Sequence, residues 1–218
     1  MRLLCLSDIH GESAGIEELL SAAEPPDVVI VAGDITHLGG REEARSILAP
    51  ILSSRARLFA VAGNMDLEPV RGYLGELGVD LHGRGTLVGD VGFMGLGGGT
   101  RSPFGTPWEL EDGEAARCLA AGLAQITAAS FRILVSHAPP HGTELDRGLA
   151  GQHFGSGPVR EFLLSGSVNF CVCGHVHESA GEDSLGGAPC VNLGPFKHGN
   201  YALVTIDGGR AYVTRRTI

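Results

Sequence analysis

Seven side chains with metal-binding atoms follow apolar segments of the sequence. Each of five apolar runs ends in polar residues of this kind, which are Asp8, His10, Asp34, Asn64, His137, His175 and His177. Carboxylate, amide and imidazole groups are oxygen and nitrogen donors of intermediate hardness. They suit Mn²⁺, Fe²⁺, Zn²⁺ or Ni²⁺ and suit Ca²⁺ poorly. The spacing therefore predicts a metal site built from five distant segments.

The number of ligands indicates more than one ion, because seven side chains are too many for one tetrahedral ion. If Asp34 bridges, two ions have four protein ligands each and keep positions for water and substrate. Two divalent ions carry more positive charge than Asp8 and Asp34 cancel, so we expect an anionic substrate. Two metals about 3.5–4 Å apart lower the pKa of a water and clamp both oxygens of a displacement at phosphorus. The predicted chemistry is hydrolysis of a phosphate ester by a bridging hydroxide.

The segment CVCGHVH, residues 171–177, allows a different metal site. In a continuous strand, four side chains would share one face, as the ligands of a Cys₂His₂ zinc site do: Cys171, Cys173, His175 and His177. Gly174 favours a break in the strand, and a closed zinc site leaves the other four segments without a role. We therefore favour the five-segment site.

The elements that must position these residues alternate along the chain. Five nearly continuous apolar runs predict strands buried on both faces, at 2–7, 27–33, 57–63, 131–136 and 169–174. Apolar residues at helical spacing predict helices at 16–23, 41–52 and 70–77 and within the Ala-rich segment 110–129. This alternation favours parallel pairing through right-handed crossovers, which delivers the carboxyl ends of the strands to one crevice.

The last third of the chain has a different pattern. Short strands are predicted at 189–194, 201–207 and 211–216, with DGG at 207–209 as a hairpin turn. We expect a second, partly antiparallel sheet there. Because the sequence has no internal repeat and no long linker, residues 1–218 are expected to form one domain.

The amino-acid composition disfavours some classes of binding partner. Of 218 residues, 43% are hydrophobic and 19% charged, which is typical of a folded protein. The net charge of -9 disfavours an extended nucleic acid as a partner. No apolar run approaches the ~20 residues of a membrane span, so no membrane partner is expected. Five cysteines, mostly in apolar runs, suit reduced thiols, and we expect a cytoplasmic protein.

Five ordered blocks of sequence resemble the signature of the calcineurin-like metallophosphoesterases. They are DIH (8–10), GD (33–34), GN followed by Asp66 (63–66), His137, and GHVH (174–177). The resemblance implies an α/β fold, a four-layer α/β/β/α sandwich of two mixed β-sheets flanked by helices. The segments 136–147 and 174–179 are similar to those of a small prokaryotic branch of predicted phosphoesterases related to cyclic-nucleotide phosphodiesterases.

The resemblance also implies an assignment of the metal ligands. One ion would be held by Asp8, His10, Asp34 and His177, and the other by Asp34, Asn64, His137 and His175. Mn²⁺ is the favoured metal of the pair, with Fe²⁺, Zn²⁺ or Ni²⁺ as alternatives.

Met65 departs from the family's pattern. Most catalytic members have His there, as a proton donor to the leaving oxygen or a contact to the phosphate. Methionine has no proton to give, and general acid catalysis is typically worth ~10²–10⁴ in rate. The candidate catalytic residues are therefore Asn64 and, as a substitute acid, His141, for which an ordinary loop role is the alternative.

These observations favour a dinuclear-metal phosphodiesterase acting on small diesters such as cyclic nucleotides. One alternative is a phosphomonoesterase of the same fold. The other is a non-catalytic scaffold, like the retromer subunit that resembles this family. Met65 favours the scaffold hypothesis, whereas the complete set of seven candidate ligands argues against that hypothesis.

Several residues outside the signature receive weaker predictions. In the loop 97–109, Phe104 and Trp108 are expected to pack rather than bind a base, and Arg101 to be solvated. Asn192 is expected to order a turn near the site. No role is assigned to four histidines, which are His37, His82, His153 and His198.

Overall fold

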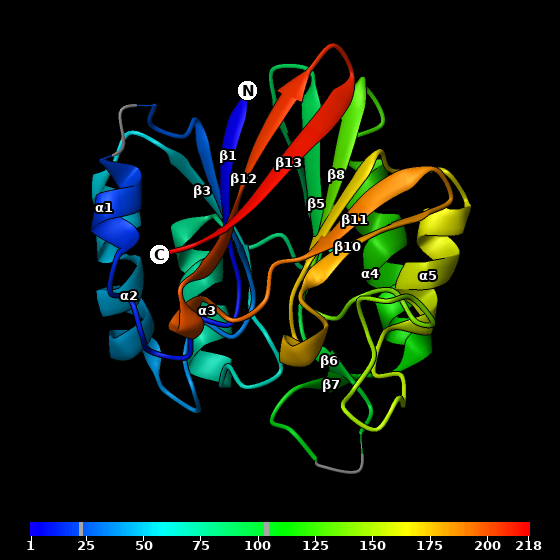
Figure 1. Cartoon of the computed structure of the whole chain (residues 1–218), viewed down its shortest axis with the longest axis horizontal. Helices are drawn as coiled ribbons and strands as arrows, with labels where there is room; N and C mark the ends of the chain where they lie inside the picture. Colours follow the sequence, from blue (N-terminus) through cyan, green and yellow to red (C-terminus); the bar gives the residue numbers. More distant parts are fainter. Residues whose placement is uncertain (22–23, 103–104) are drawn as a thin grey trace.

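Two mixed β-sheets pack face to face at the centre of the computed structural model, which describes residues 1–21, 24–102 and 105–218 (Figure 1). The first sheet has the order β13-β12-β1-β2-β3. Its strands are β1 (Arg2–Leu6), β2 (Val28–Ala32), β3 (Arg57–Val61), β12 (Asn200–Asp207) and β13 (Arg210–Thr217). β1, β2 and β3 are parallel, whereas β12 runs antiparallel to both β1 and β13.

The second sheet has the order β10-β11-β9-β8-β5-β4. Its strands are β4 (Gly85–Val88), β5 (Val91–Leu96), β8 (Phe131–Ser136), β9 (Phe170–Cys173), β10 (Gly181–Leu185) and β11 (Ala188–Asn192). The inner four strands are parallel and the two edge strands are antiparallel to their neighbours. A short pair, β6 (Gly99–Thr100) with β7 (Glu109–Leu110), lies apart from both sheets.

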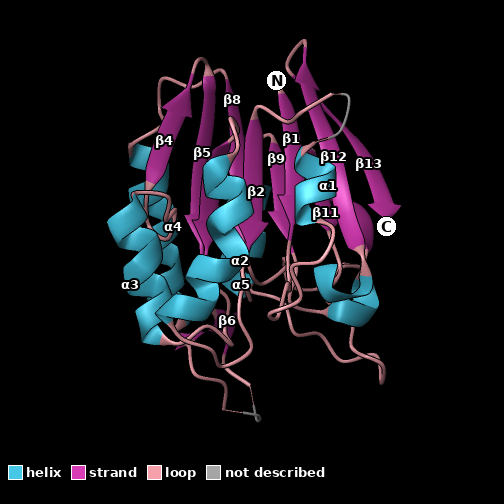
Figure 2. Cartoon of the chain, turned by 90° about the vertical axis from the view of Figure 1, so that its left-hand side faces the viewer, coloured by secondary structure: helices cyan, strands magenta, loops and turns pink. Residues whose placement is uncertain are grey.

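Helices cover the outer face of each sheet. The first sheet carries α1 (Ile16–Leu20), α2 (Arg41–Ser53) and α3 (Glu68–Leu77), which lie in front of the strands in Figure 2. The second sheet carries α4 (Asp112–Ala124) and α5 (Gly157–Leu164). Two short 3₁₀ helices, η1 (His177–Ser179) and η2 (Phe196–His198), follow strand ends. The predicted four-layer α/β/β/α sandwich is therefore confirmed.

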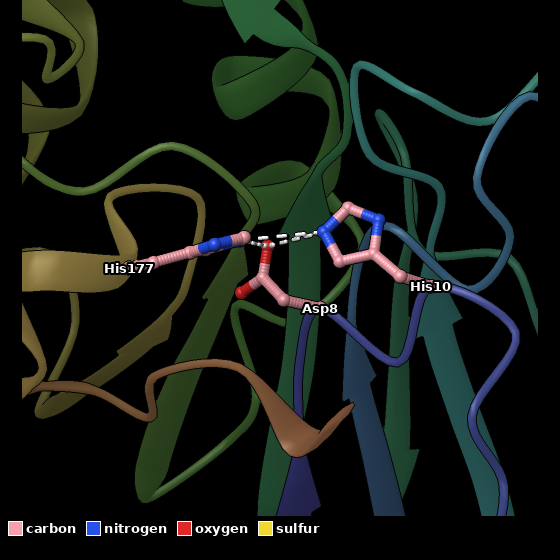
Figure 3. A group of neighbouring side chains, drawn as sticks. All are labelled: Asp8, His10 and His177. Carbon is pink, nitrogen blue, oxygen red and sulfur yellow. Dashed lines mark hydrogen bonds and ion pairs between the residues drawn. The ribbon is translucent and has the colours of Figure 1, made fainter. Parts of the chain in front are cut away.

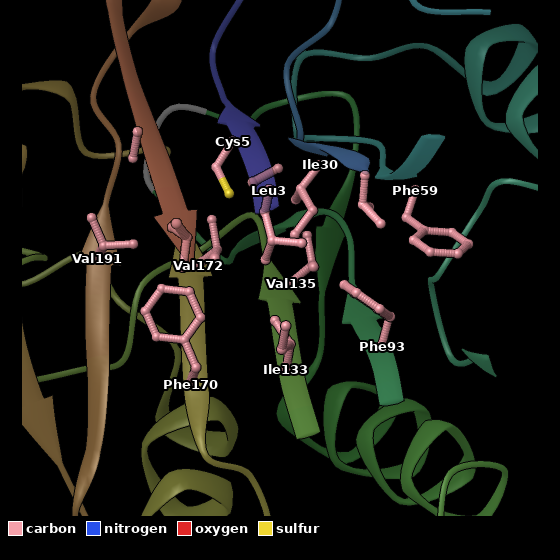
Figure 4. Close-up of a cluster of buried hydrophobic side chains, with 14 of the residues drawn as sticks. Leu3, Cys5, Ile30, Phe59, Phe93, Ile133, Val135, Phe170, Val172 and Val191 are labelled. Carbon is pink, nitrogen blue, oxygen red and sulfur yellow. The ribbon is translucent and has the colours of Figure 1, made fainter. Parts of the chain in front are cut away.

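The apolar faces of the two sheets form the central core between them. Side chains such as Ile30, Phe93, Ile133 and Phe170 are fully buried there, and they point toward one another from both sheets in Figure 4. The rings of Phe59 and Phe93 meet across the gap, with centroids 5.0 Å apart. Strands buried on both faces explain why the predicted strand segments are nearly continuous in apolar residues.

The prediction of a separate C-terminal sheet is wrong. β11 joins the second sheet beside β9, and the β12–β13 hairpin joins the first sheet beside β1. β12 alternates buried and exposed residues from Ala202 to Asp207, and its buried face completes the central core. The DGG turn is confirmed: Gly208 and Gly209 both have positive φ, which a two-residue hairpin turn favours.

Some elements were not predicted. β5 contains Gly92 and Gly95, which obscure its strand pattern, and α5 was missed entirely. A Cβ at Gly92 would lie 2.8 Å from the Ala129 side chain and 2.9 Å from Ile126, so glycine lets the segment after α4 pack directly on the strand. α1 ends at Leu20, before the predicted limit at residue 23, and α4 lies within the predicted segment 110–129. Ala23 and Phe104 lie outside the described residues.

None of the helices within the described ranges is both long and apolar enough to cross a membrane.

Candidate metal centre

Four of the seven predicted ligands have a strained backbone. Outside glycine, positive φ occurs in the described residues at Leu38 and at four predicted ligands, which are Asp8, His10, Asp34 and His175. A backbone with positive φ costs a residue that has a Cβ on the order of 1–3 kcal/mol, and such conformations are typical of functional sites. Each of these residues follows a parallel strand, where the chain must turn sharply to bring the side chain into the crevice.

The first group of candidate ligands combines Asp8, His10 and His177. The His177 Nε2 atom lies 3.2 Å from Asp8 Oδ1, and the His10 Nε2 atom lies 3.3 Å from His177 Nε2. Figure 3 shows both imidazole rings turned toward the carboxylate from opposite sides. One oxygen and two nitrogens are therefore directed at the same small volume.

The second group combines Asp8, Asp34 and His137, all buried. Asp8 is common to both groups, and Asp34 also approaches the first group: its Oδ1 lies 3.5 Å from His137 Nε2 and its Oδ2 lies 3.7 Å from His10 Nε2. A carboxylate that turns one oxygen to each group has the arrangement required of a bridging ligand.

The two remaining predicted ligands adjoin the second group. Asn64 Oδ1 lies 2.8 Å from His137 Nε2. The ring centroid of His175 lies 5.0 Å from that of His137, and the His175 backbone N–H donates to the Asp8 carboxylate at 3.1 Å. The structure thus brings all seven predicted residues to one end of the two sheets.

Glycines before the ligands make this convergence possible. A Cβ at Gly174 would lie 1.9 Å from Ser7 Oγ and 2.3 Å from Asp8 Oδ2, and one at Gly63 would lie 2.0 Å from Asp34 Oδ1. The backbone of one ligand segment therefore lies against the side chain of another, which a residue with a Cβ would prevent.

Replacement of Gly174 by alanine is expected to destabilise the fold and impair metal uptake. Ser7 and Asp8 are fully buried, so the added methyl group must displace them, and such overpacking costs about 1–3 kcal/mol. A Cβ at Gly75, within α3, would meet nothing within 4 Å beyond the backbone of its own helix, so Gly75→Ala is a matched control that should be neutral or stabilising. Thermal unfolding and metal content would check both; equal behaviour of the two variants would contradict the packing argument.

Burial keeps two of the imidazoles neutral. It lowers the pKa of His10 to about 4 and that of His175 to about 3. A neutral imidazole offers a nitrogen lone pair, which is the form that binds a metal ion. The chemistry of these two side chains therefore fits a cation at this site.

The carboxylates differ from each other. Burial opposes ionisation of Asp8, but a hydrogen bond from His177 and the charge of His137 outweigh it and hold the Asp8 pKa well below its usual range. Burial raises the pKa of Asp34 to about 7. Although burial opposes protonation of His137, the charges of Asp34 and Asp8 raise its pKa above the usual value. Without a cation, the Asp34–His137 pair therefore retains at least one proton near neutral pH.

At about pH 6, Mn²⁺ binding is expected to release protons from the Asp34–His137 pair. Metal ligands must be deprotonated, and the Asp34 pKa of about 7 lies above this pH, whereas His10 and His175 are already neutral. Affinity should therefore fall as pH decreases below about 7. Calorimetry in two buffers of different ionisation enthalpy counts the protons. No release at about pH 6, with constant affinity up to about pH 8, would contradict this assignment.

A cavity of about 350 Å³ opens above the candidate ligands. His10, Asp34, Asn64, His175 and His177 line it, and they are joined by the less polar side chains of Met65, Phe154 and Val176. Pockets of this size hold small molecules. A larger hollow of about 720 Å³ lies around the start of β1 and the end of α2 and contains none of the seven residues.

Met65 lines the cavity directly. Its backbone N–H donates to Asp34 Oδ1 at 2.8 Å, which fixes its position beside that carboxylate. The thioether therefore occupies a place from which a side chain can contact a bound substrate.

His141 lies elsewhere. It lines a separate cavity with Arg101 and Glu111, and its Nδ1 faces Asp146 Oδ2 at 3.6 Å. Its ring also contacts His153, with centroids 5.5 Å apart. This placement gives no support to the prediction that His141 replaces the missing acid, and it fits the alternative loop role.

The cysteines of CVCGHVH do not join the site. β9 ends at Cys173, and both Cys171 and Cys173 are buried in the cluster between the second sheet and α4 and α5. The five cysteines are all unpaired thiols. His175 and His177 lie beyond Gly174 and turn toward the site, so the Cys₂His₂ arrangement is wrong.

Other predictions about the surrounding residues are confirmed. Asn192 orders the adjacent chain, because its Nδ2 donates to the carbonyl groups of Leu145 and Val176. Trp108 packs beneath Arg71, whose guanidinium lies 4.4 Å from the ring centroid. Arg101 is exposed, as predicted, but it also forms an ion pair with Glu111, which was not predicted.

Two supporting residues were missed. His37 lies beside His10, with their Nδ1 atoms 3.4 Å apart, and lines the cavity; its sequence context, three residues after Asp34, was the available signal. Asp66 belongs to the GN block, but its own role could not be predicted. Its buried carboxylate accepts hydrogen bonds from the backbone N–H groups of Ile35, Thr36 and Gly63. These bonds tie the loops of Asp34 and Asn64 together.

Residues 1–179 of the chain match the model of the calcineurin-like phosphoesterase family. The chain is also 32% identical over 203 residues to the uncharacterized protein MJ1162 of Methanocaldococcus jannaschii, covering 89% of this chain and 88% of that protein. This protein belongs to the calcineurin-like phosphoesterases, a family that depends on two metal ions.

Solved structures share the fold. The crystal structure of the Thermus thermophilus protein TT1561 matches with a TM-score of 0.75 at 18% identity, covering 98% of this chain and 97% of that one. The phosphopantetheinyl hydrolase of Mycobacterium tuberculosis matches with a TM-score of 0.61 at 14% identity, covering 97% and 95%.

Proposed function

We propose that this protein is a dinuclear-metal phosphodiesterase that hydrolyses small phosphate diesters. The observation that carries the proposal is the position of Asp34, whose two oxygens face His137 and His10 respectively. One ion is assigned to Asp8, His10, Asp34 and His177, and the other to Asp34, Asn64, His137 and His175. Mn²⁺ is the proposed metal.

The bound ions would supply an acidified water and positive charge for the phosphate. The chain itself provides the remaining functions. Burial lowers the pKa values of His10 and His175 and keeps both imidazoles neutral, while Asp8 stays ionised. Asn64 lines the cavity with its Oδ1 beside His137 Nε2, so its amide NH₂ group is the part that can donate to a phosphate oxygen.

The cavity favours a diester over a monoester. A diester carries two organic groups, and Met65, Phe154 and Val176 offer them apolar surface beside the polar floor. The cavity volume of about 350 Å³ suits a small substrate, and the net charge of -9 disfavours an extended nucleic acid. The free cysteines support a cytoplasmic location.

The test is hydrolysis by Mn²⁺-loaded protein of an aryl phosphodiester, an aryl phosphomonoester and a cyclic nucleotide. We expect metal-dependent turnover that is fastest on the diester, and loss of turnover in His175→Ala. Preference for the monoester would favour the phosphomonoesterase. No metal-dependent turnover on any substrate would favour the scaffold, which Met65 alone supports.

A further inference from the structure

The chain contains a single lysine, Lys197, and the structure places it at the cavity above the candidate ligands. All other basic side chains except the histidines are arginines, and none of these lines that cavity. Among the described residues, Lys197 is therefore the only permanent cation at this cavity.

The backbone at Lys197 is anchored to the metal-binding segment. The N–H of Phe196, a buried residue, donates to the Ser7 carbonyl at 2.8 Å, and the N–H of Lys197 itself approaches the Asp8 carbonyl at 3.5 Å. Two further hydrogen bonds close the short η2 turn around it. Lys197 is thus held next to Asp8 rather than carried on a free loop.

The charge of Lys197 is available to a ligand. No ion pair within the described ranges includes this residue, although exposed Glu178 also lines the cavity. Lys197 lines the same cavity as the candidate ligands His10 and His177, so its positive charge lies beside the space that a ligand would occupy.

Depth separates Lys197 from the candidate ligands. Asp8 and Asp34 have 0% and 3% of their surface exposed, whereas Lys197 is exposed at the rim with His37. A phosphate held at the floor by cations would leave the outer part of its ester group near this rim. An apolar group there would gain nothing from an ammonium ion, whereas an anionic group would form a charge-assisted hydrogen bond, which is stronger than one to a neutral acceptor.

We propose that Lys197 forms a second anion subsite, so that the preferred substrates carry a carboxylate or phosphate on the organic group besides the phosphate that reacts. This inference rests on the proposed function, because only an enzyme has substrates. Binding of an anion at Lys197 can nevertheless be tested without turnover. It is a specificity-determining role, since Lys197 contacts the part of the substrate that does not react.

The test uses two rigid, non-hydrolysable anions, phenylphosphonate and para-carboxyphenylphosphonate, titrated calorimetrically into Mn²⁺-loaded protein. We expect para-carboxyphenylphosphonate to bind about tenfold or more tightly than phenylphosphonate, because its carboxylate would add a charged hydrogen bond to Lys197. Lys197→Met should reduce this advantage to less than about threefold, while Lys197→Arg should keep most of it. Arg210→Met, at the far end of the β12–β13 hairpin, removes the same charge and should change nothing.

An equal advantage in wild type and Lys197→Met, or no advantage in wild type, would overturn the subsite. Parallel turnover assays on para-nitrophenyl phenyl phosphate and its carboxyphenyl analogue separate this outcome from failure of the proposed function. Turnover without carboxylate selectivity would refute the subsite and leave the phosphodiesterase intact. Selective binding without turnover of either diester would refute the proposed phosphodiesterase function and leave the subsite intact.

Discussion

Asp34→Asn is expected to lower metal-dependent kcat/KM more than about 100-fold. Loss of groups that only support metal ligands typically costs 10–100-fold, and Asp34 faces both sets of ligands, with Oδ1 toward His137 and Oδ2 toward His10. Asparagine keeps the size of the side chain and an oxygen for the Met65 N–H, but it loses the negative charge. The measurement is turnover of an aryl phosphodiester together with the metal content of the same sample.

Asp207→Asn is the matched control, because Asp207 is exposed at the end of β12, remote from the strand ends that carry the site. It should retain wild-type turnover and metal content. If Asp34→Asn bound metal and turned over substrate within about threefold of wild type, Asp34 would not be the shared ligand.

Met65→His is expected to raise turnover of diesters with alkyl leaving groups at least tenfold, within the ~10²–10⁴ that a positioned acid can contribute. The backbone of Met65 is held by Asp34 and its side chain lines the cavity, so an imidazole there would face the substrate. A nitrophenyl leaving group needs no proton, so its turnover should change less than about threefold.

Met65→Leu separates the acid from a change of shape, since it keeps an apolar side chain of similar size. It should leave turnover of both kinds of diester near the wild-type value. Equal increases on alkyl and nitrophenyl diesters in Met65→His would refute the view that this site lacks a proton donor.

The convergence of the candidate ligands was largely predictable because parallel strands deliver their carboxyl ends to one edge. Asp8, Asp34 and His137 could be assigned from that rule and the apolar runs before them. What the rule does not give is the sheet that each strand joins. The three C-terminal segments were therefore assigned together to a second sheet, whereas β11 pairs with β9 and β12 pairs with β1. That choice depends on long-range burial, which local periodicity does not encode.

Residues that act through tertiary contacts were harder to find. His37 and Lys197 lie five residues beyond the ends of β2 and β11 rather than directly after them, and they reach the cavity only because of how their turns pack. His141 shows the opposite error: its loop is near the signature in sequence, but its side chain turns to Asp146 and His153. Sequence proximity to a motif is thus weaker evidence than the strand-end position.

The most direct measurement is the number of Mn²⁺ ions bound per chain, obtained by elemental analysis of loaded, desalted protein and by spin coupling in its electron paramagnetic resonance spectrum. The proposed assignment predicts two ions with exchange coupling between them, as a shared Asp34 carboxylate requires. One ion or none per chain, or two uncoupled ions, would contradict it.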